Sequence, residues 1–189
     1  CTLCLAAAFV MLLMIPFTVD EVIAMGQFLA KSVREGKSFW RTFWVGGTME
    51  GGEKDSRTPS YGSPVRKMAP AMIWGVTAPW PLIISAVLGI WLIFAPAIFG
   101  TEGNAANSDR LVGALIVTVA VIAMAEVVRA GRFLNVLFGA WIIVAPWLLN
   151  GAATSAKWNG VITGAVLILL SLRRGQIREP YGSWGRYIF

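Results

Sequence analysis

Five long apolar runs, separated by shorter polar stretches, follow one another along the chain. They cover residues 3–19, 82–99, 111–128, 133–149 and 158–172. Runs of this kind suit the hydrocarbon core of a bilayer, which is about 30 Å thick. A helix satisfies its own backbone hydrogen bonds in lipid, whereas an open sheet does not. The pattern therefore predicts an all-α integral membrane protein with five transmembrane helices.

The second and fourth runs carry the same motif. Residues 89–96 read GIWLIFAP and residues 139–146 read GAWIIVAP. The residues kept in register include Gly89, Trp91 and Pro96 in the first copy and Gly139, Trp141 and Pro146 in the second. Each copy is followed by a short polar stretch and a second apolar run. The repeated unit is therefore a pair of helices, at about 82–128 and again at 133–172.

Short connections between these four helices predict antiparallel neighbours, and hence a compact four-helix bundle. Ser85 and Gly89, like Gly160 and Gly164, are four residues apart, a spacing that lets membrane helices approach closely. We expect the two repeated tryptophans to fill the space beside the glycines and to donate hydrogen bonds across the bundle. An aromatic cage for a lipid or a quinone is the alternative interpretation of these tryptophans.

A polar stretch divides the chain into two parts. Residues 46–67 are rich in Gly, Ser, Pro and charged side chains and have no apolar period, which predicts a flexible linker. Residues 1–45 before it hold the first helix and a segment of alternating basic and aromatic residues, which suits an anionic membrane surface. Residues 68–189 form the second membrane domain and end in a basic tail.

Composition agrees with a membrane environment. Hydrophobic residues make up 57% of the chain and charged residues 14%, against about 45–50% and about 25% in soluble domains. The 16 Lys and Arg residues outnumber the 10 Asp and Glu residues, a balance that is also typical of nucleic-acid-binding proteins. Their placement argues against nucleic acid, because they follow the order of the predicted helices.

The basic residues predict the orientation of the chain. All of them except Arg110 and Lys157 lie in residues 31–78, 129–132 and 173–189. If the helices alternate and the N-terminus lies outside, these three segments all face the cytoplasm, as the positive-inside rule requires. The sequence therefore predicts a multi-pass protein of the cell's inner membrane, with the N-terminus outside and the C-terminus in the cytoplasm.

The candidate chemistry lies at the beginning of the chain. Cys1 and Cys4 are the two cysteines, and their i, i+3 spacing puts both sulfurs on one face of a helix, close enough to form a disulfide. Such a pair can be redox-active, bind a metal or be simply apolar. The chain contains no His for a mixed zinc site, and the predicted orientation places the pair on the oxidising side. We therefore predict a redox pair and no metal.

Residues 1 to about 47 resemble the C-terminal end of a bacterial vitamin K epoxide reductase family protein. The resemblance rests on the Cys1-Thr2-Leu3-Cys4 sequence, on residues 18–29 and on residues 39–44. It implies that the cysteine pair passes electrons from a partner disulfide to quinone, with Cys4 nearer the quinone and Cys1 nearer the relay cysteines. It also implies upstream helices, a second cysteine pair and a possible thioredoxin-like partner, so we expect the chain to be part of a longer protein and inactive alone.

Residues 82–172 resemble the SPW-repeat family, small membrane modules of paired helices named for a Ser-Pro-Trp sequence. The matching positions read Ala95-Pro96-Ala97 and Ala145-Pro146-Trp147, so the Ser is replaced in both copies and the Trp in one. This resemblance implies no activity. Together the two resemblances predict the C-terminal part of a membrane thiol:quinone oxidoreductase that carries an SPW-type module. The alternative is a non-catalytic membrane module that packs against a protein partner or lipid.

The predicted orientation can be tested with the two cysteines. In intact cells, a membrane-impermeant thiol reagent applied after reduction should label Cys1 or Cys4, because both should lie outside the membrane. Labelling that requires permeabilised cells would contradict the orientation and, with it, the redox hypothesis.

Overall fold

The computed structural model describes residues 2–47, 62–71, 73–173 and 175–178. Its helices are α1 (Thr2–Arg34), α2 (Phe39–Val45), α3 (Val65–Ala71), α4 (Trp80–Phe99), α5 (Gly103–Ile122), the 3-10 helix η1 (Glu126–Phe133), α6 (Leu134–Leu148) and α7 (Thr154–Leu172). The described residues contain no strand, and five helical segments are long and apolar enough to cross a membrane. The predicted fold class is confirmed.

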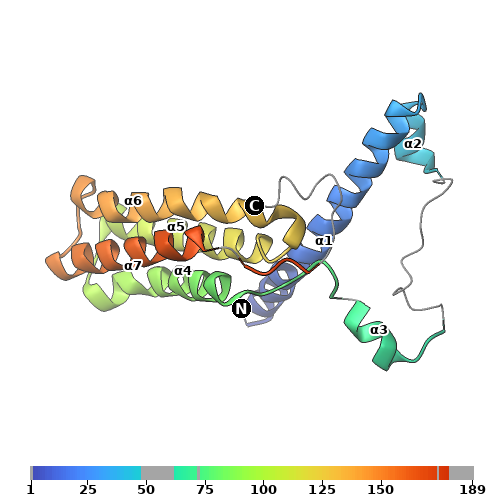
Figure 1. Ribbon diagram of the computed structural model, residues 1–189. Helices are drawn as coiled ribbons and strands as arrows, with labels where there is room; N and C mark the ends of the chain where they lie inside the picture. The colour runs from blue at the N-terminus through green and yellow to red at the C-terminus, as the bar shows by residue number, and fades with distance from the viewer. Residues whose placement is uncertain (1, 48–61, 72, 174, 179–189) are drawn as a thin grey trace.

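Helices α4 to α7 form a four-helix bundle (Figure 1). Each of α4 and α6 packs against both α5 and α7. The core is built from equivalent residues of the two repeats: Leu92 corresponds to Ile142, and Ile116 corresponds to Leu167, and all four are almost completely buried. The two helix pairs are therefore related by an approximate two-fold axis that runs along the bundle.

Glycines set the distance between the helices of each pair. A Cβ atom added to Gly89 of α4 would lie 2.7 Å from the carbonyl oxygen of Gly113 in α5, and one added to Gly113 would lie 2.6 Å from the oxygen of Gly89. The same reciprocal contact joins Gly139 of α6 to Gly164 of α7, at 2.9 and 2.5 Å. Real Cβ atoms do not approach oxygen this closely, so the two backbones touch only because both positions are glycine.

The repeated tryptophans connect one helix pair to the other. The indole N–H of Trp91 in α4 donates to the side-chain oxygen of Asn159 in α7, and that of Trp141 in α6 donates to the hydroxyl of Ser108 in α5, each at 3.0 Å. The hydrogen bonds across the bundle that we expected are thus present. Pro96 and Pro146 are buried late in α4 and α6.

The chain between α5 and α6 differs from the sequence prediction. The helix expected at 111–128 begins earlier, at Gly103, and ends at Ile122. Its first turns are helical although they contain many polar residues, because Ala105 and Ala106 on one face are buried against the bundle. The short cytoplasmic loop expected at 129–132 is instead part of the largely buried helix η1.

The predicted linker lies mostly in residues 48–61, outside the described part of the chain. Helix α3 begins at Val65, within the last residues of the range assigned to that linker. Cys1 and residues 179–189 of the predicted basic tail also lie outside the described residues.

Helix α1 runs obliquely past one end of the bundle (Figure 1) and contacts α5 and η1. Asp20, beyond the middle of α1, approaches the segment that leads into α4: a Cβ atom added to Gly75 would lie 2.8 Å from its carboxylate. Residues of α1 before Asp20 span about 27 Å at about 1.5 Å per residue. That length matches the thickness of the hydrocarbon core.

The glycine contacts give a direct test of the bundle. Gly89→Leu or Gly139→Leu should lower the unfolding free energy in detergent by at least about 3 kcal/mol, because the new side chain meets backbone that cannot yield. Gly26→Leu is the matched control, since nothing lies within 4 Å of its Cβ position in α1. Equal stability of Gly89→Leu and Gly26→Leu would show that the α4–α5 contact is wrong.

Candidate functional site

Four arginines of the described residues gather at one end of the bundle, which we call the basic end. They are Arg129 and Arg132 on η1, Arg173 after α7, and Arg178 near the end of the described chain. The basic end is where α4 and α6 begin and where α5 and α7 end. Four separate stretches of chain meet there, and the basic end is therefore the candidate functional site.

The connector, which we define as residues 73–79, is held to the turn after α5 by backbone hydrogen bonds. The N–H of Thr77 donates to the carbonyl of Met124 at 2.9 Å, and the N–H of Glu126 donates to the carbonyl of Gly75 at 2.8 Å. Val76 and Ala125 pair between them in an antiparallel bridge. Because its backbone groups have partners, this non-helical segment can lie next to membrane helices.

Glu126 fixes the C-terminal segment, residues 175–178, against the connector. Its side chain is fully buried, and both carboxylate oxygens accept the backbone N–H of Arg178, at 3.1 and 3.0 Å. A carboxylate this deeply buried needs such donors, because an uncompensated charge in the interior is costly. Figure 1 shows this red segment beside the green connector.

Arg129 joins the connector and the C-terminal segment from the other side. Its guanidinium donates to the hydroxyl and, at 3.5 Å, to the carbonyl of Thr77, whose hydroxyl in turn donates to the carbonyl of Gln176 at 3.3 Å. A Cβ atom added to Gly175 would lie 2.6 Å from this guanidinium and 2.7 Å from Pro79. Only glycine fits between them.

Arg132 and Asn135 complete the buried polar cluster, which consists of Glu126, Arg129, Arg132 and Asn135. The Nε of Arg132 donates to the carbonyl of Ser171 at the end of α7, at 3.2 Å, and its guanidinium lies 4.8 Å from the ring centre of Phe133. All four side chains are at most 2% exposed. Through Glu126, Arg129 and Arg132, the cluster therefore links η1 to α7, to the connector and to the C-terminal segment.

A groove of about 730 Å³ lies next to the cluster. Phe17 of α1 forms one wall, connector residues and the start of α4 form another, and Gly175, Gln176 and Arg178 form a third. Its volume exceeds that of a second cavity among the described residues, and it is open at the surface of the basic end.

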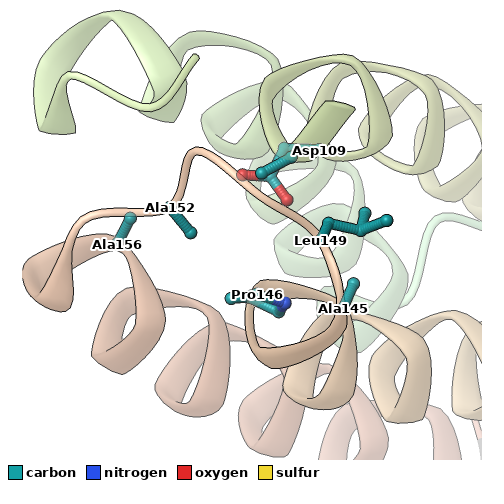
Figure 2. Close-up of a pocket in the computed structure, with 7 residues that line it drawn as sticks. Asp109, Ala145, Pro146, Leu149, Ala152 and Ala156 are labelled. Carbon is teal, nitrogen blue, oxygen red and sulfur yellow. The ribbon is translucent and has the colours of Figure 1, made fainter. Parts of the chain in front are cut away.

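The other cavity is a crevice at the opposite end of the bundle. Figure 2 shows the carboxylate of Asp109 in α5 directed toward the turn that carries Leu149 and Ala152. An acidic residue within a membrane span is a functional candidate by default. The crevice, however, has no room for a water molecule. Asp109 therefore has no site for a ligand beside it in this structure.

The structure leaves the sequence-predicted site residues on separate elements. Cys4 lies in the first turns of α1, exposed and as a free thiol, while Cys1 lies outside the described residues. The repeated Gly, Trp and Pro residues lie on α4 and α6 and serve packing. No group of three or more His, Cys, Asp or Glu side chains among the described residues could hold a metal ion.

Sequence reasoning missed the buried polar cluster. From the sequence, Glu126 was placed in the apolar run at 111–128, and Arg129 and Arg132 in a short cytoplasmic segment. A signal was present, because Glu126, Arg129, Arg132 and Asn135 are spaced by three. A period of three is that of a 3-10 helix, and Glu126, Arg129 and Arg132 lie on η1, with Asn135 at the start of α6. The apolar residues between them hid this pattern inside the longer apolar runs.

Comparison with known proteins gave one result. Residues 72–174 match the family model described as "SPW repeat domain". Neither the search of curated proteins nor the search of solved structures gave a match. The matched residues include all four helices of the bundle, η1 and the whole connector.

Removal of the Glu126 carboxylate tests the polar cluster. Glu126→Ala should lower the unfolding free energy in detergent by about 1–3 kcal/mol, because the buried N–H of Arg178 loses its acceptor. Glu102→Ala removes an exposed carboxylate from the loop before α5 and should change it by less than about 0.5 kcal/mol. The same small effect for both variants would contradict the role assigned to Glu126.

Proposed function

Since the chain belongs to the SPW repeat domain family, we propose that this multi-pass membrane protein acts as a non-catalytic module that anchors and positions chain segments at its basic end. One observation carries the proposal. The buried charged groups Glu126, Arg129 and Arg132 are engaged in joining η1 to α7, to the connector and to the C-terminal segment. Groups used in this way hold a structure together and leave the bundle interior without a reaction site.

The proposed module sits in the cell's inner membrane with its basic end at the cytoplasmic surface. The positive-inside rule supports this orientation, because four arginines lie at the basic end. The opposite end has Lys157, whose ammonium lies 4.8 Å from the ring centre of Trp147, and Arg110 on α5. Tryptophans thus lie near both ends of the bundle, Trp80 at the start of α4 and Trp147 near the end of α6, as is typical of interfacial belts.

A second candidate is the thiol:quinone oxidoreductase implied by the resemblance of residues 1–47 to the vitamin K epoxide reductase family. The exposure of Cys4 in the first turns of α1 favours it, since a thiol must be accessible to exchange with a partner. In this reaction the thiols of Cys1 and Cys4 form a disulfide and pass two electrons and two protons to a quinone, which becomes a quinol. A thioredoxin-like partner or relay cysteines would then reduce the disulfide again.

The groove does not serve the second candidate. Its α1 residue, Phe17, lies roughly 20 Å along the helix axis from Cys4 at about 1.5 Å per residue. Electron transfer from a thiolate to a quinone requires contact between the two. A quinone would therefore need a site near Cys4, to which the described residues contribute only the exposed start of α1. For this reason we prefer the non-catalytic module.

Cysteine-dependent quinone reduction by this chain would overturn the non-catalytic proposal. The purified full chain in lipid nanodiscs, supplied with a reduced dithiol and a short-chain quinone, should reduce the quinone no faster than the Cys1→Ser/Cys4→Ser double variant. The double variant should also keep the unfolding midpoint of the unchanged chain, because Cys4 is exposed. A rate that depends on both cysteines would overturn the non-catalytic proposal and support the oxidoreductase.

A further inference from the structure

The groove at the basic end has a polar side and an apolar side. Thr77, Gln176 and Arg178 supply the polar groups, and Phe17, Ile73 and Trp80 supply the apolar surface. Its volume of about 730 Å³ falls within the range of about 300–1,000 Å³ that is typical of organic ligand sites. A ligand that matches this lining has both an apolar and a polar part.

The charges at the groove are positive. Arg178 lines it, with a backbone fixed by the two hydrogen bonds to Glu126, and its side chain is exposed. Arg173 lies beside it, its guanidinium 5.6 Å from the ring centre of Trp80. The described lining contains no acidic residue, although the carboxylate of Asp20 approaches the connector at Gly75. The polar part of a matching ligand is therefore anionic.

The groove opens between two membrane-spanning segments. Phe17 belongs to α1 and Trp80 to the first turn of α4, and both helices are long and apolar enough to span a bilayer. Trp80 is 52% exposed, as expected of a tryptophan at the depth of the lipid headgroups. Basic sites between helices on this side of a membrane attract anionic lipid headgroups.

We propose that this groove binds one anionic phospholipid. Arg173 and Arg178 hold its phosphate, Thr77 and Gln176 face the polar headgroup, and the beginning of an acyl chain lies against Phe17 and Trp80. The lipid fills the space between α1 and the bundle and so stabilises the contact of α1 with the connector. This inference rests on the proposed module, because it uses the same basic end and the same membrane orientation.

The test measures the thermal unfolding midpoint of the full chain in a neutral detergent. Phosphatidylglycerol and phosphatidylcholine with identical short acyl chains are added in separate titrations. A ligand that binds the folded state raises the midpoint with its concentration. Phosphatidylglycerol should reach half of its full effect at a lower concentration than phosphatidylcholine, because only its headgroup carries a net negative charge.

Matched variants locate the binding site. Arg173→Gln and Arg178→Gln should each raise the half-saturating concentration of phosphatidylglycerol about fivefold, the usual contribution of one basic residue at an anionic surface. Arg110→Gln and Lys157→Gln, on the other half of the bundle, should leave it unchanged. Ala78→Trp fills the groove from an exposed position and should abolish the effect while the midpoint without lipid stays the same.

Three results would overturn the inference. They are an equal response to the two lipids, an equal loss in the Arg110→Gln and Arg178→Gln variants, and full stabilisation by inorganic phosphate without an acyl chain. None of them bears on the proposed module, which fails if quinone reduction depends on the cysteines. The two proposals can therefore fail separately.

Discussion

The backbone contact between facing glycines determines the spacing of the bundle. Gly89 meets Gly113 and Gly139 meets Gly164, each pair closer than any side chain allows. At this distance Leu92, Ile116, Ile142 and Leu167 fill the core completely. The repeated indoles then join one helix pair to the other through hydrogen bonds to Asn159 and Ser108. The repeat motif is therefore best understood as architecture, because its Gly and Trp residues each make a contact that holds two helices together.

A tightly closed bundle leaves its ends as the places for polar chemistry, and the two ends differ. At the end near Asp109 the crevice is too small for water. At the basic end, Glu126 and Arg129 bind the connector and the C-terminal segment. Buried ionic groups often contribute more to a unique arrangement than to stability. Here they fix non-helical segments next to the membrane helices, and the groove between these segments and α1 results from that arrangement.

The sequence was sufficient to predict the helices and the contacts that occur in both repeats. Apolar runs predicted five spanning helices, and the paired motif predicted the cross-bundle hydrogen bonds of Trp91 and Trp141. Prediction from the sequence failed where polar residues are buried. The first turns of α5 and residues 129–132 of η1 were assigned to loops, because hydropathy cannot distinguish an exposed Arg129 from one that is fully enclosed. The groove is lined by segments from three distant parts of the chain, so no local sequence pattern predicts it. The possible redox role of Cys1 and Cys4 stays a prediction.

The anchoring role of the basic end depends on the hydrogen bonds that hold residues 75–77 and 175–178. Hydrogen–deuterium exchange of the chain in lipid nanodiscs measures them directly, residue by residue. The amides of Thr77, Glu126 and Arg178 should exchange as slowly as those of the bundle helices, because each donates to a partner at the basic end. Exchange of Thr77 and Arg178 at the rate of an unstructured peptide, with the bundle still protected, would contradict a basic end that anchors these segments.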